Sequence, residues 1–171
     1  MDILDIIRKR RSIREYKKDM PKDTEIEKIL ESGRWAPSGL NNQPWRFLVI
    51  KEKGKKDGLG KFTKPEYADT IRNAPVVLIV CMDNADSYNR DKDLMAIGAC
   101  IENILLTAHA AGLATCWMGE IINQKEKLAK YLKLDEDLEI MAVITFGYSD
   151  EDIAEGCRKP LNSLMIAPRK V

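Results

Sequence analysis

The chain has 171 residues, with 28 Lys and Arg against 27 Asp and Glu, so its formal net charge is +1. Hydrophobic residues make up 44% of the chain and charged residues 32%, a balance that excludes global disorder. The near-zero net charge argues against a histone-like protein. Since domains contain about 100–200 residues, we expect residues 1–171 to form a single domain.

The sequence predicts neither a membrane span nor a metal site. The longest uninterrupted apolar run, residues 74–82, is shorter than the roughly 20 residues that a span requires. The basic residues near the N-terminus follow the first apolar segment, which is the wrong order for a signal peptide. The cysteines show no paired spacing suited to zinc, and three lie in apolar stretches; they are Cys81, Cys100, Cys116 and Cys157. We therefore expect a reduced, cytoplasmic protein.

Two amphipathic helices are predicted near the N-terminus. Asp2 is the expected N-cap of the first helix, whose apolar face carries Ile3, Ile6 and Ile7. Asp23 is the expected N-cap of the second helix, which ends near Gly33.

A loop and two strands are expected to follow. Pro37 and Pro44 bracket a polar loop, after which residues 45–51 predict a strand. Residues 53–60 are rich in lysine and glycine and predict irregular structure. Residues 76–82 are continuously apolar, which is typical of a strand buried on both faces.

Residues 93–111 carry the strongest helical pattern. This helix is apolar nearly all round and is therefore expected to be buried. Ala96, Gly98 and Ala99 are small enough to let a second helix approach closely, and in so short a chain that helix could belong to another subunit.

The last third of the chain predicts two strands, a helix and a tail. The strands cover residues 113–118 and 140–148. Between them, Asn123 and Glu126 resemble a capping box for a helix that runs through Leu132. Residues 156–171 predict an extended tail that needs an external surface on which to lie.

The first candidate site is a basic cluster around Ser12. Guanidinium groups bind phosphate oxygens in a bidentate manner, and a hydroxyl adds one more donor. The alternative is a solvated helix end, where cations favour the helix dipole. Nucleic-acid binding is not expected, because the cluster is short and lacks interleaved aromatic residues. Its members are Arg8, Lys9, Arg10, Arg11 and Arg14.

The second candidate is the polar loop at residues 37–45. Asn41, Asn42 and Gln43 offer both donors and acceptors, which suits the edge of a planar heterocycle. Asn and Gly also form turns, but three amides plus Ser38 exceed what a turn requires.

Two weaker segments and one histidine complete the candidates. Gly119 in segment 117–120 would let the backbone approach a ligand ring, although a turn explains it as well. Segment 158–161 carries Arg158, which either binds an anion or adds solubility. The single histidine, His109, lies in the apolar helix, which favours a structural role.

Motifs for nucleophilic or metal-dependent catalysis are absent from the sequence. It contains no GxSxG, HExxH, GxxxxGK[ST] or GxGxxG pattern. With no evident catalytic side chain, an enzyme of this sequence would need a cofactor to carry its chemistry.

Taken together, these segments resemble the flavin-dependent nitroreductase family. Residues 10–14 are similar to its R-R-S-x-R segment, and residues 37–45 to its P-S-x-x-N-x-Q-P-W loop. Asn73-Ala74-Pro75, the apolar helix, segment 117–120 and segment 158–161 follow in the order typical of the family.

This resemblance implies an α+β fold in which a mixed, mostly antiparallel sheet is flanked by helices. It also implies an intertwined homodimer that binds FMN at the interface, with the tail at residues 156–171 packed on the partner subunit. Both the apolar helix and the unsupported tail suit such a dimer.

The resemblance also implies a set of cofactor-binding residues. Arg10, Ser12 and Arg14 would hold the phosphate, the ribityl chain and the pyrimidine side of the flavin. Gly119 and Glu120 would place a backbone N–H near flavin N5. The full set is Arg10, Arg11, Ser12, Arg14, Pro37, Ser38, Gly39, Leu40, Asn41, Gln43, Met118, Gly119, Glu120 and Arg158.

Two groups of these residues lie far from the N-terminal segment in the sequence. Residues 37–41, contributed by the other subunit, would line the flavin ring with Gln43 nearby. Arg158 would join Arg10 on the phosphate.

The implied function is that of an FMN-dependent NAD(P)H oxidoreductase with a ping-pong mechanism. NADH or NADPH gives a hydride to flavin N5, and a small-molecule acceptor such as a nitroaromatic or a quinone then takes the electrons. The flavin carries the chemistry, and Arg14 would stabilise negative charge on the reduced flavin.

Two alternatives stay open. The protein could be a specialised flavin-destroying or dehalogenating member of the same fold, although the lid residues that such enzymes add are not evident. It could also bind FMN without turnover, as a store or a sensor.

Overall fold

The computed structural model describes residues 2–152 and 154–166. Its centre is a four-stranded sheet in the order β1-β2-β4-β3, in which every neighbouring pair is antiparallel. The strands are β1 (Trp45–Ile50), β2 (Val76–Asp83), β3 (Ala114–Trp117) and β4 (Leu138–Gly147). All four lie where the apolar patterns predict them. A parallel bridge between Ser12 and Thr115 adds the N-terminal segment to the edge of β3, so the sheet is mixed and mostly antiparallel.

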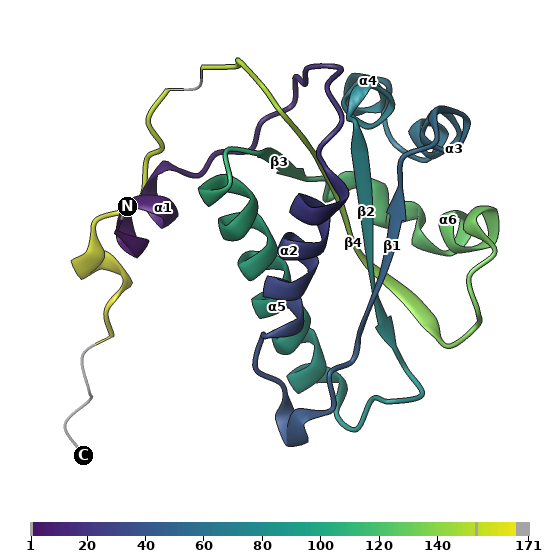
Figure 1. The fold of residues 1–171 in the computed structure, drawn as a ribbon. Helices are drawn as coiled ribbons and strands as arrows, with labels where there is room; N and C mark the ends of the chain where they lie inside the picture. Colours follow the sequence, from purple (N-terminus) through teal and green to yellow (C-terminus); the bar gives the residue numbers. More distant parts are fainter. Residues whose placement is uncertain (1, 153, 167–171) are drawn as a thin grey trace.

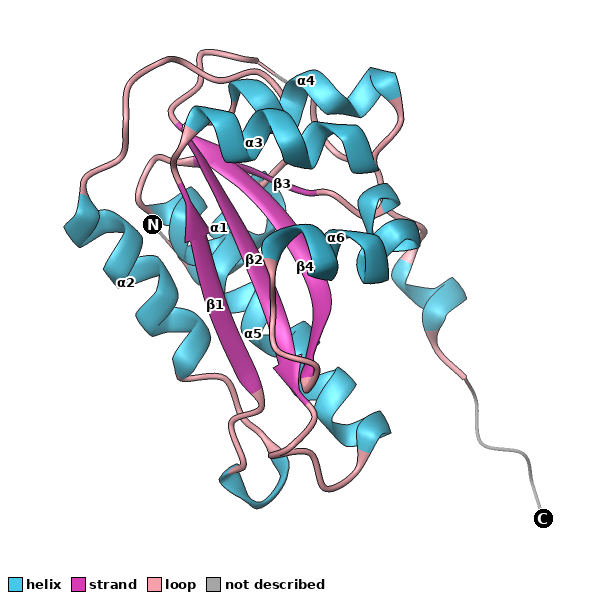
Figure 2. Ribbon diagram, turned by 90° about the vertical axis from the view of Figure 1, so that its right-hand side faces the viewer, coloured by secondary structure: helices cyan, strands magenta, loops and turns pink. Residues whose placement is uncertain are grey.

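Helices cover both faces of this sheet (Figures 1 and 2). Helices α2 (Asp23–Arg34) and α5 (Arg90–Ala110) pack on one face, and α3 (Lys53–Leu59), α4 (Pro65–Asn73) and α6 (Lys125–Leu132) on the other. The short helix α1 (Ile3–Lys9) lies apart, near the C-terminal end of α5. The fold is thus α+β, as expected.

Strand β2 divides the core in two. Its alternate residues Val76, Leu78 and Val80 join the α2/α5 core, whereas Val77 and Ile79 join the α3/α4/α6 core. Side chains alternate between the two faces of a strand, and both faces here are covered by helices. This arrangement explains why the sequence of β2 is continuously apolar.

Helix α5 is buried as its pattern predicts, and it begins at Arg90. The side chain of Asn89 accepts a hydrogen bond from the backbone N–H of Lys92 at 3.2 Å, which moves the start upstream of the predicted residue 93. By length and composition alone α5 could cross a membrane. It packs against α2 and the sheet, however, and the core helices of soluble proteins pass the same test.

The prediction of irregular structure at residues 53–60 is wrong, because Lys53–Leu59 form α3. The ammonium of Lys56 donates to the carbonyls of Ala74 at 2.6 Å and Pro75 at 3.0 Å. Leu59 is fully buried in the core. These tertiary contacts outweigh the low helix propensity of the glycines.

Two predicted N-caps are also wrong. Helix α2 is capped by Lys22, whose backbone N–H donates to the Glu25 carboxylate at 2.8 Å, so Asp23 lies inside the helix. Asn123 lies within a 3₁₀ turn at Glu120–Gln124, and this turn moves the N-cap of α6 to Gln124. Asp2 does precede α1 but makes no side-chain capping hydrogen bond.

Gly33 sets how closely α2 approaches α5, and we predict that Gly33→Ala destabilises the protein. An added Cβ would lie 2.8 Å from two atoms of the fully buried Ile104 and 3.1 Å from the Cys100 sulfur. Overpacking of this kind costs about 1–3 kcal/mol, which exceeds the roughly 1 kcal/mol that alanine gains in helix propensity. Urea denaturation should therefore show a lower free energy of unfolding.

The matched control is Gly54→Ala, in the first turn of α3. A Cβ there would meet no atom within 4 Å, so this variant should be at least as stable as the parent. Equal stability of the two variants would contradict the assigned packing.

Candidate functional site

The N-terminal basic segment is held in place by the edge of the sheet. The backbone N–H of Ile13 donates to the Thr115 carbonyl at 2.8 Å, beside the Ser12–Thr115 bridge. The hydroxyl of Tyr16 donates to the Ile13 carbonyl at 2.8 Å. Residues 10–14 thus lie alongside β3. One cavity lies near Arg10 and another near Arg14.

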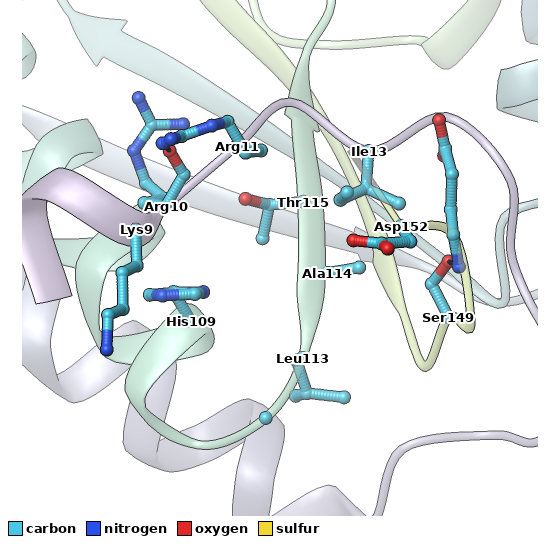
Figure 3. A pocket seen from close by; sticks show the side chains of 12 residues that line it. Lys9, Arg10, Arg11, Ile13, His109, Leu113, Ala114, Thr115, Ser149 and Asp152 are labelled. Carbon is cyan, nitrogen blue, oxygen red and sulfur yellow. Dashed lines mark hydrogen bonds between the residues drawn. The ribbon is translucent and has the colours of Figure 1, made fainter. Parts of the chain in front are cut away.

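The first of these, the basic cavity, has a volume of about 330 Å³ (Figure 3). Cationic side chains enter it from the end of α1, and His109 enters from the end of α5. The segment after β4 contributes Ser149 and two carboxylates. The residues of these three groups are Lys9, Arg10, Arg11, His109, Ser149, Glu151 and Asp152.

Arg10 gives this cavity its capacity to bind an anion. Its Nε is buried and has no hydrogen-bond partner among the described residues. The Oε1 atom of Glu102 lies 4.0 Å away, too far for a hydrogen bond. A buried donor without an acceptor is costly, and an anionic oxygen in the cavity would satisfy it.

Arg11, also expected to bind the cofactor, has two of its three guanidinium nitrogens engaged elsewhere. Its guanidinium donates to the carbonyls of Arg8 at 2.5 Å, Arg10 at 2.8 Å and Ala154 at 3.2 Å. Although Arg11 lines the basic cavity, in this chain it mainly joins the N-terminal segment to the C-terminal one.

The second cavity, which we term the ring cavity, has a volume of about 170 Å³. Arg14, Met118, Gly119 and Glu120, all expected site residues, line it together with Tyr67 and Cys116. A Cβ on Gly119 would meet no atom within 4 Å, so its backbone faces open space that a planar ligand could fill.

The Glu120 carboxylate is bound within the fold. It accepts hydrogen bonds from the Thr63 hydroxyl at 2.5 Å and from the Lys64 backbone N–H at 3.1 Å. These two bonds lower the pKa of Glu120 below its ordinary value. Glu120 therefore ties the turn after β3 to the start of α4, which carries Tyr67.

Sequence reasoning missed the residue that positions Arg14. One carboxylate oxygen of Glu151 accepts the backbone N–H groups of Arg14 at 2.9 Å and Glu15 at 3.0 Å. Glu151 follows β4 in a polar run with no recognisable motif, so its sequence context carries no signal of this contact.

The polar loop has a strained and specific conformation. It contains a 3₁₀ turn, Gly39–Asn41, and three of its side-chain-bearing residues have positive φ: Leu40 (54°), Asn41 (55°) and Gln43 (49°). A Cβ on Gly39 would lie 1.7 Å from the Tyr88 hydroxyl, so any larger residue there would displace the Tyr88 side chain. Strain of this kind persists only where the surroundings enforce it.

Asp93 is the main anchor of this loop. Its fully buried carboxylate accepts the side-chain amide of Asn42 at 2.8 Å and the Ser87 hydroxyl at 2.7 Å. Burial raises the pKa of Asp93. The hydrogen bonds from Ser87, Asn42 and nearby backbone N–H groups lower it by more, so the pKa of Asp93 lies below its ordinary value. An ionised Asp93 thus holds the loop against α5.

The polar loop lies near the N-terminal end of α5 (Figure 1), whereas the basic cavity is lined by His109 at the C-terminal end of this helix. Pro37, Ser38 and Gly39 line a separate hollow beside Met95, near the N-terminal end of this helix. With 21 residues, α5 spans about 30 Å. One chain therefore does not bring the two expected halves of the site together.

Arg158 also lies away from the basic cavity. It is exposed, and its guanidinium donates to the Cys157 carbonyl at 2.8 Å. Residues 167–171 of the predicted tail lie outside the described residues.

The thiols are poorly suited to chemistry. Burial raises the pKa of Cys81 to about 11 and that of Cys100 to about 12, and it also raises that of Cys116. Only Cys157 is exposed. Within residues 2–152 and 154–166, no three His, Cys, Asp or Glu side chains gather as a metal site would require.

Asp93→Asn should loosen the polar loop. Hydrogen bonds to a charged group contribute about 1.5–3 kcal/mol, so we expect a loss of this order in the free energy of unfolding at pH 7. Amide hydrogen exchange in residues 37–43 should become faster. Because folding lowers the pKa of Asp93, its contribution is present above the ordinary pKa of 3.8 and is lost as pH falls through the folded value.

Asp91→Asn is the matched control, since Asp91 is an exposed carboxylate in the same helical turn. It should change stability by no more than about 0.5 kcal/mol and leave exchange in the loop unchanged. Parental exchange rates in Asp93→Asn would show that Asp93 is not the anchor.

Comparisons with known proteins identify the family of this chain. The nitroreductase family model matches residues 7–66 and 58–148. A protein of Archaeoglobus fulgidus, whose name proposes an NADH dehydrogenase or NAD(P)H nitroreductase, is 31% identical over 155 residues, covering 88% of this chain and 87% of its own. An iodotyrosine deiodinase of Thermotoga neapolitana is 24% identical, covering 87% of this chain and 89% of its own.

Solved structures share the fold. A crystal structure of a proposed nitroreductase from Desulfovibrio desulfuricans, in complex with FMN, superposes with a TM-score of 0.91 at 42% identity, covering 98% of this chain and 96% of that one. A proposed NADH oxidase from Clostridium acetobutylicum gives a TM-score of 0.86 at 29% identity, covering 96% and 100%. The family match spans more than half of the chain, and the chain belongs to the nitroreductase family.

Proposed function

We propose that this protein is a homodimeric, FMN-dependent NAD(P)H oxidoreductase that reduces nitroaromatics, quinones or similar small acceptors. The observation that carries the proposal is the buried Arg10 Nε, a donor without a partner among the described residues, beside the basic cavity. The FMN complex of the relative that is 42% identical supports the choice of cofactor.

The two cavities divide the work of binding FMN. Arg10 in the basic cavity would hold the phosphate, and Ser12, which lies between Arg10 and Arg14 in the segment that is bridged to β3, would face the ribityl chain. Arg14 in the ring cavity would stabilise negative charge on the pyrimidine side of the flavin, an electrostatic role. When bound, FMN supplies the hydride chemistry between NAD(P)H and the acceptor.

Gly119 and Met118 form the remaining part of the ring cavity. The open space in front of Gly119 would let its turn present a backbone N–H to the flavin without a clash. The side chain of Glu120, bound to Thr63 and Lys64, would fix this turn and would not itself contact the ring.

A second copy of the chain would complete the site. Under two-fold symmetry, the N-terminal end of α5 in one copy, with its polar loop, can lie against the C-terminal end of α5 in the other copy, with its cavities. Large apolar side chains are exposed on α1, at the end of α2, on the polar loop, on α5 and in the tail, as expected for an interface. They are Ile3, Leu4, Ile7, Trp35, Leu40, Met95, Leu161, Leu164, Met165 and Ile166.

The purified protein should be yellow and should release FMN on denaturation. In anaerobic stopped-flow experiments, NADH or NADPH should bleach its visible absorbance, because the bound flavin accepts the hydride. Addition of a nitroaromatic or a quinone should then restore the colour.

The other outcomes separate the alternatives. A yellow protein that millimolar NADH and NADPH fail to bleach would be an FMN store or sensor. Reductive deiodination of iodotyrosine, with little turnover of nitroaromatics, would favour a dehalogenase, the activity named for the Thermotoga relative. A colourless protein with no affinity for FMN would overturn the proposal.

Met95→Glu tests the dimer. Met95 on α5 is 67% exposed and borders the hollow beside the polar loop. A buried charge without a partner is costly, so this variant should sediment as a monomer and lose FMN in parallel. Met20→Glu, at a 47% exposed position before α2, is the control and should stay dimeric and yellow. A monomeric variant that retains FMN would show that one chain suffices.

A further inference from the structure

His109 lies in the basic cavity, although the sequence favours a structural role for it. It stands in the last turn of α5 and is half-buried, and its ring points into the space framed by Lys9, Arg10 and Leu113 (Figure 3). Its imidazole makes no hydrogen bond with any described residue. A histidine that served only to fill the core would be enclosed, or its nitrogens would be satisfied.

The groups around His109 are mainly cationic. Burial lowers its pKa below the ordinary 6.5, and the charges of Arg10, Arg11 and Lys9 lower it further. On the same helix, Glu102 lies 4.0 Å from Arg10. After β4, Glu151 is hydrogen-bonded to two backbone N–H groups, and Asp152 lies on the far side of the 113–115 segment (Figure 3). The charges that lower the pKa of His109 are thus those of Arg10, Arg11 and Lys9, all of them positive.

A phosphate group in this cavity would make the surroundings of His109 less positive. Its charge of about −2 would offset most of the charge of the three cations and favour the charged imidazolium, whose two N–H groups both donate. A neutral imidazole has only one donor.

We propose that His109 is a further phosphate-binding residue, which takes up one proton from solvent when the phosphate of FMN enters the basic cavity. This proposal rests on the proposed function, since FMN supplies the phosphate. Ligand binding of this kind is linked to pH: the contribution of His109 is complete at low pH and is lost as pH rises through the pKa of the complex.

The chain contains a single histidine, so one imidazole signal reports directly on this site. We would measure its NMR titration in untagged, full-length protein loaded either with FMN or with riboflavin, which lacks the phosphate. The expected result is a pKa at least about one unit higher with FMN than with riboflavin. Equal values in the two forms would overturn the proposal.

His109→Gln provides a second measurement. At pH 6 it should weaken FMN binding about tenfold or more, and at pH 8.5 it should have little effect. Ionisation of the phosphate itself cancels in the ratio of variant to parent. Riboflavin affinity should be the same for both proteins, which a merely structural role of His109 would not predict.

Arg8→Gln is the matched control. Arg8 lies next to Lys9 in the last turn of α1 but does not line the basic cavity. Its effect on FMN affinity should be small and independent of pH. If the parent binds neither FMN nor riboflavin, the proposed function fails. If FMN binds but His109→Gln reproduces the parent's affinity at pH 6, only the inference about His109 fails.

Discussion

Helix α5 imposes the constraint on which the rest of the site depends. Its apolar surface is fixed between α2 and the sheet, so its two ends stay about 30 Å apart. One end carries the basic cavity and the other carries the polar loop held by Asp93. Under the proposed function, each chain would therefore hold two different half-sites that only a second copy could combine. The proposed dimer would then follow from the geometry of one buried helix, and it would account for the exposed apolar side chains at both ends of that helix.

Stability and binding share the same contacts along the edge of the sheet. An unpaired edge strand invites association with other chains, and the N-terminal segment pairs with part of β3 through Ser12 and Ile13. The same pairing orients Arg10 and Arg14 toward their cavities. Glu151 then fixes Arg14 by accepting its backbone N–H. Because of this overlap, changes to the segment at residues 10–14 should affect folding and flavin affinity together, so the proposed tests use riboflavin and pH to separate the two.

The sequence predicted the features that are local and missed those that depend on distant contacts. Strand β2 and helix α5 follow from their own apolar patterns, whereas the assignment of the two motifs to a cofactor site stays a prediction. Helix α3 was missed because Lys56 finds its acceptors 18 residues away, at Ala74. The contact of Glu151 with Arg14 joins residues 137 positions apart. No pattern within a short window can report such pairs, because side chains become neighbours only once the sheet has formed.

The nearly neutral total charge conceals a local imbalance with chemical consequences. Lys9, Arg10 and Arg11 meet at one end of the molecule, where the pKa of His109 is lowered by burial and by their charges. A cavity of this kind favours an anionic ligand, because an anionic oxygen can accept a hydrogen bond from the buried Arg10 Nε and also offset the surrounding positive charge. In the proposed complex, a phosphate would accept from Arg10 and favour a protonated His109 at the same time. The two residues would therefore act cooperatively, so that losing Arg10 should also remove the pH dependence that His109 confers.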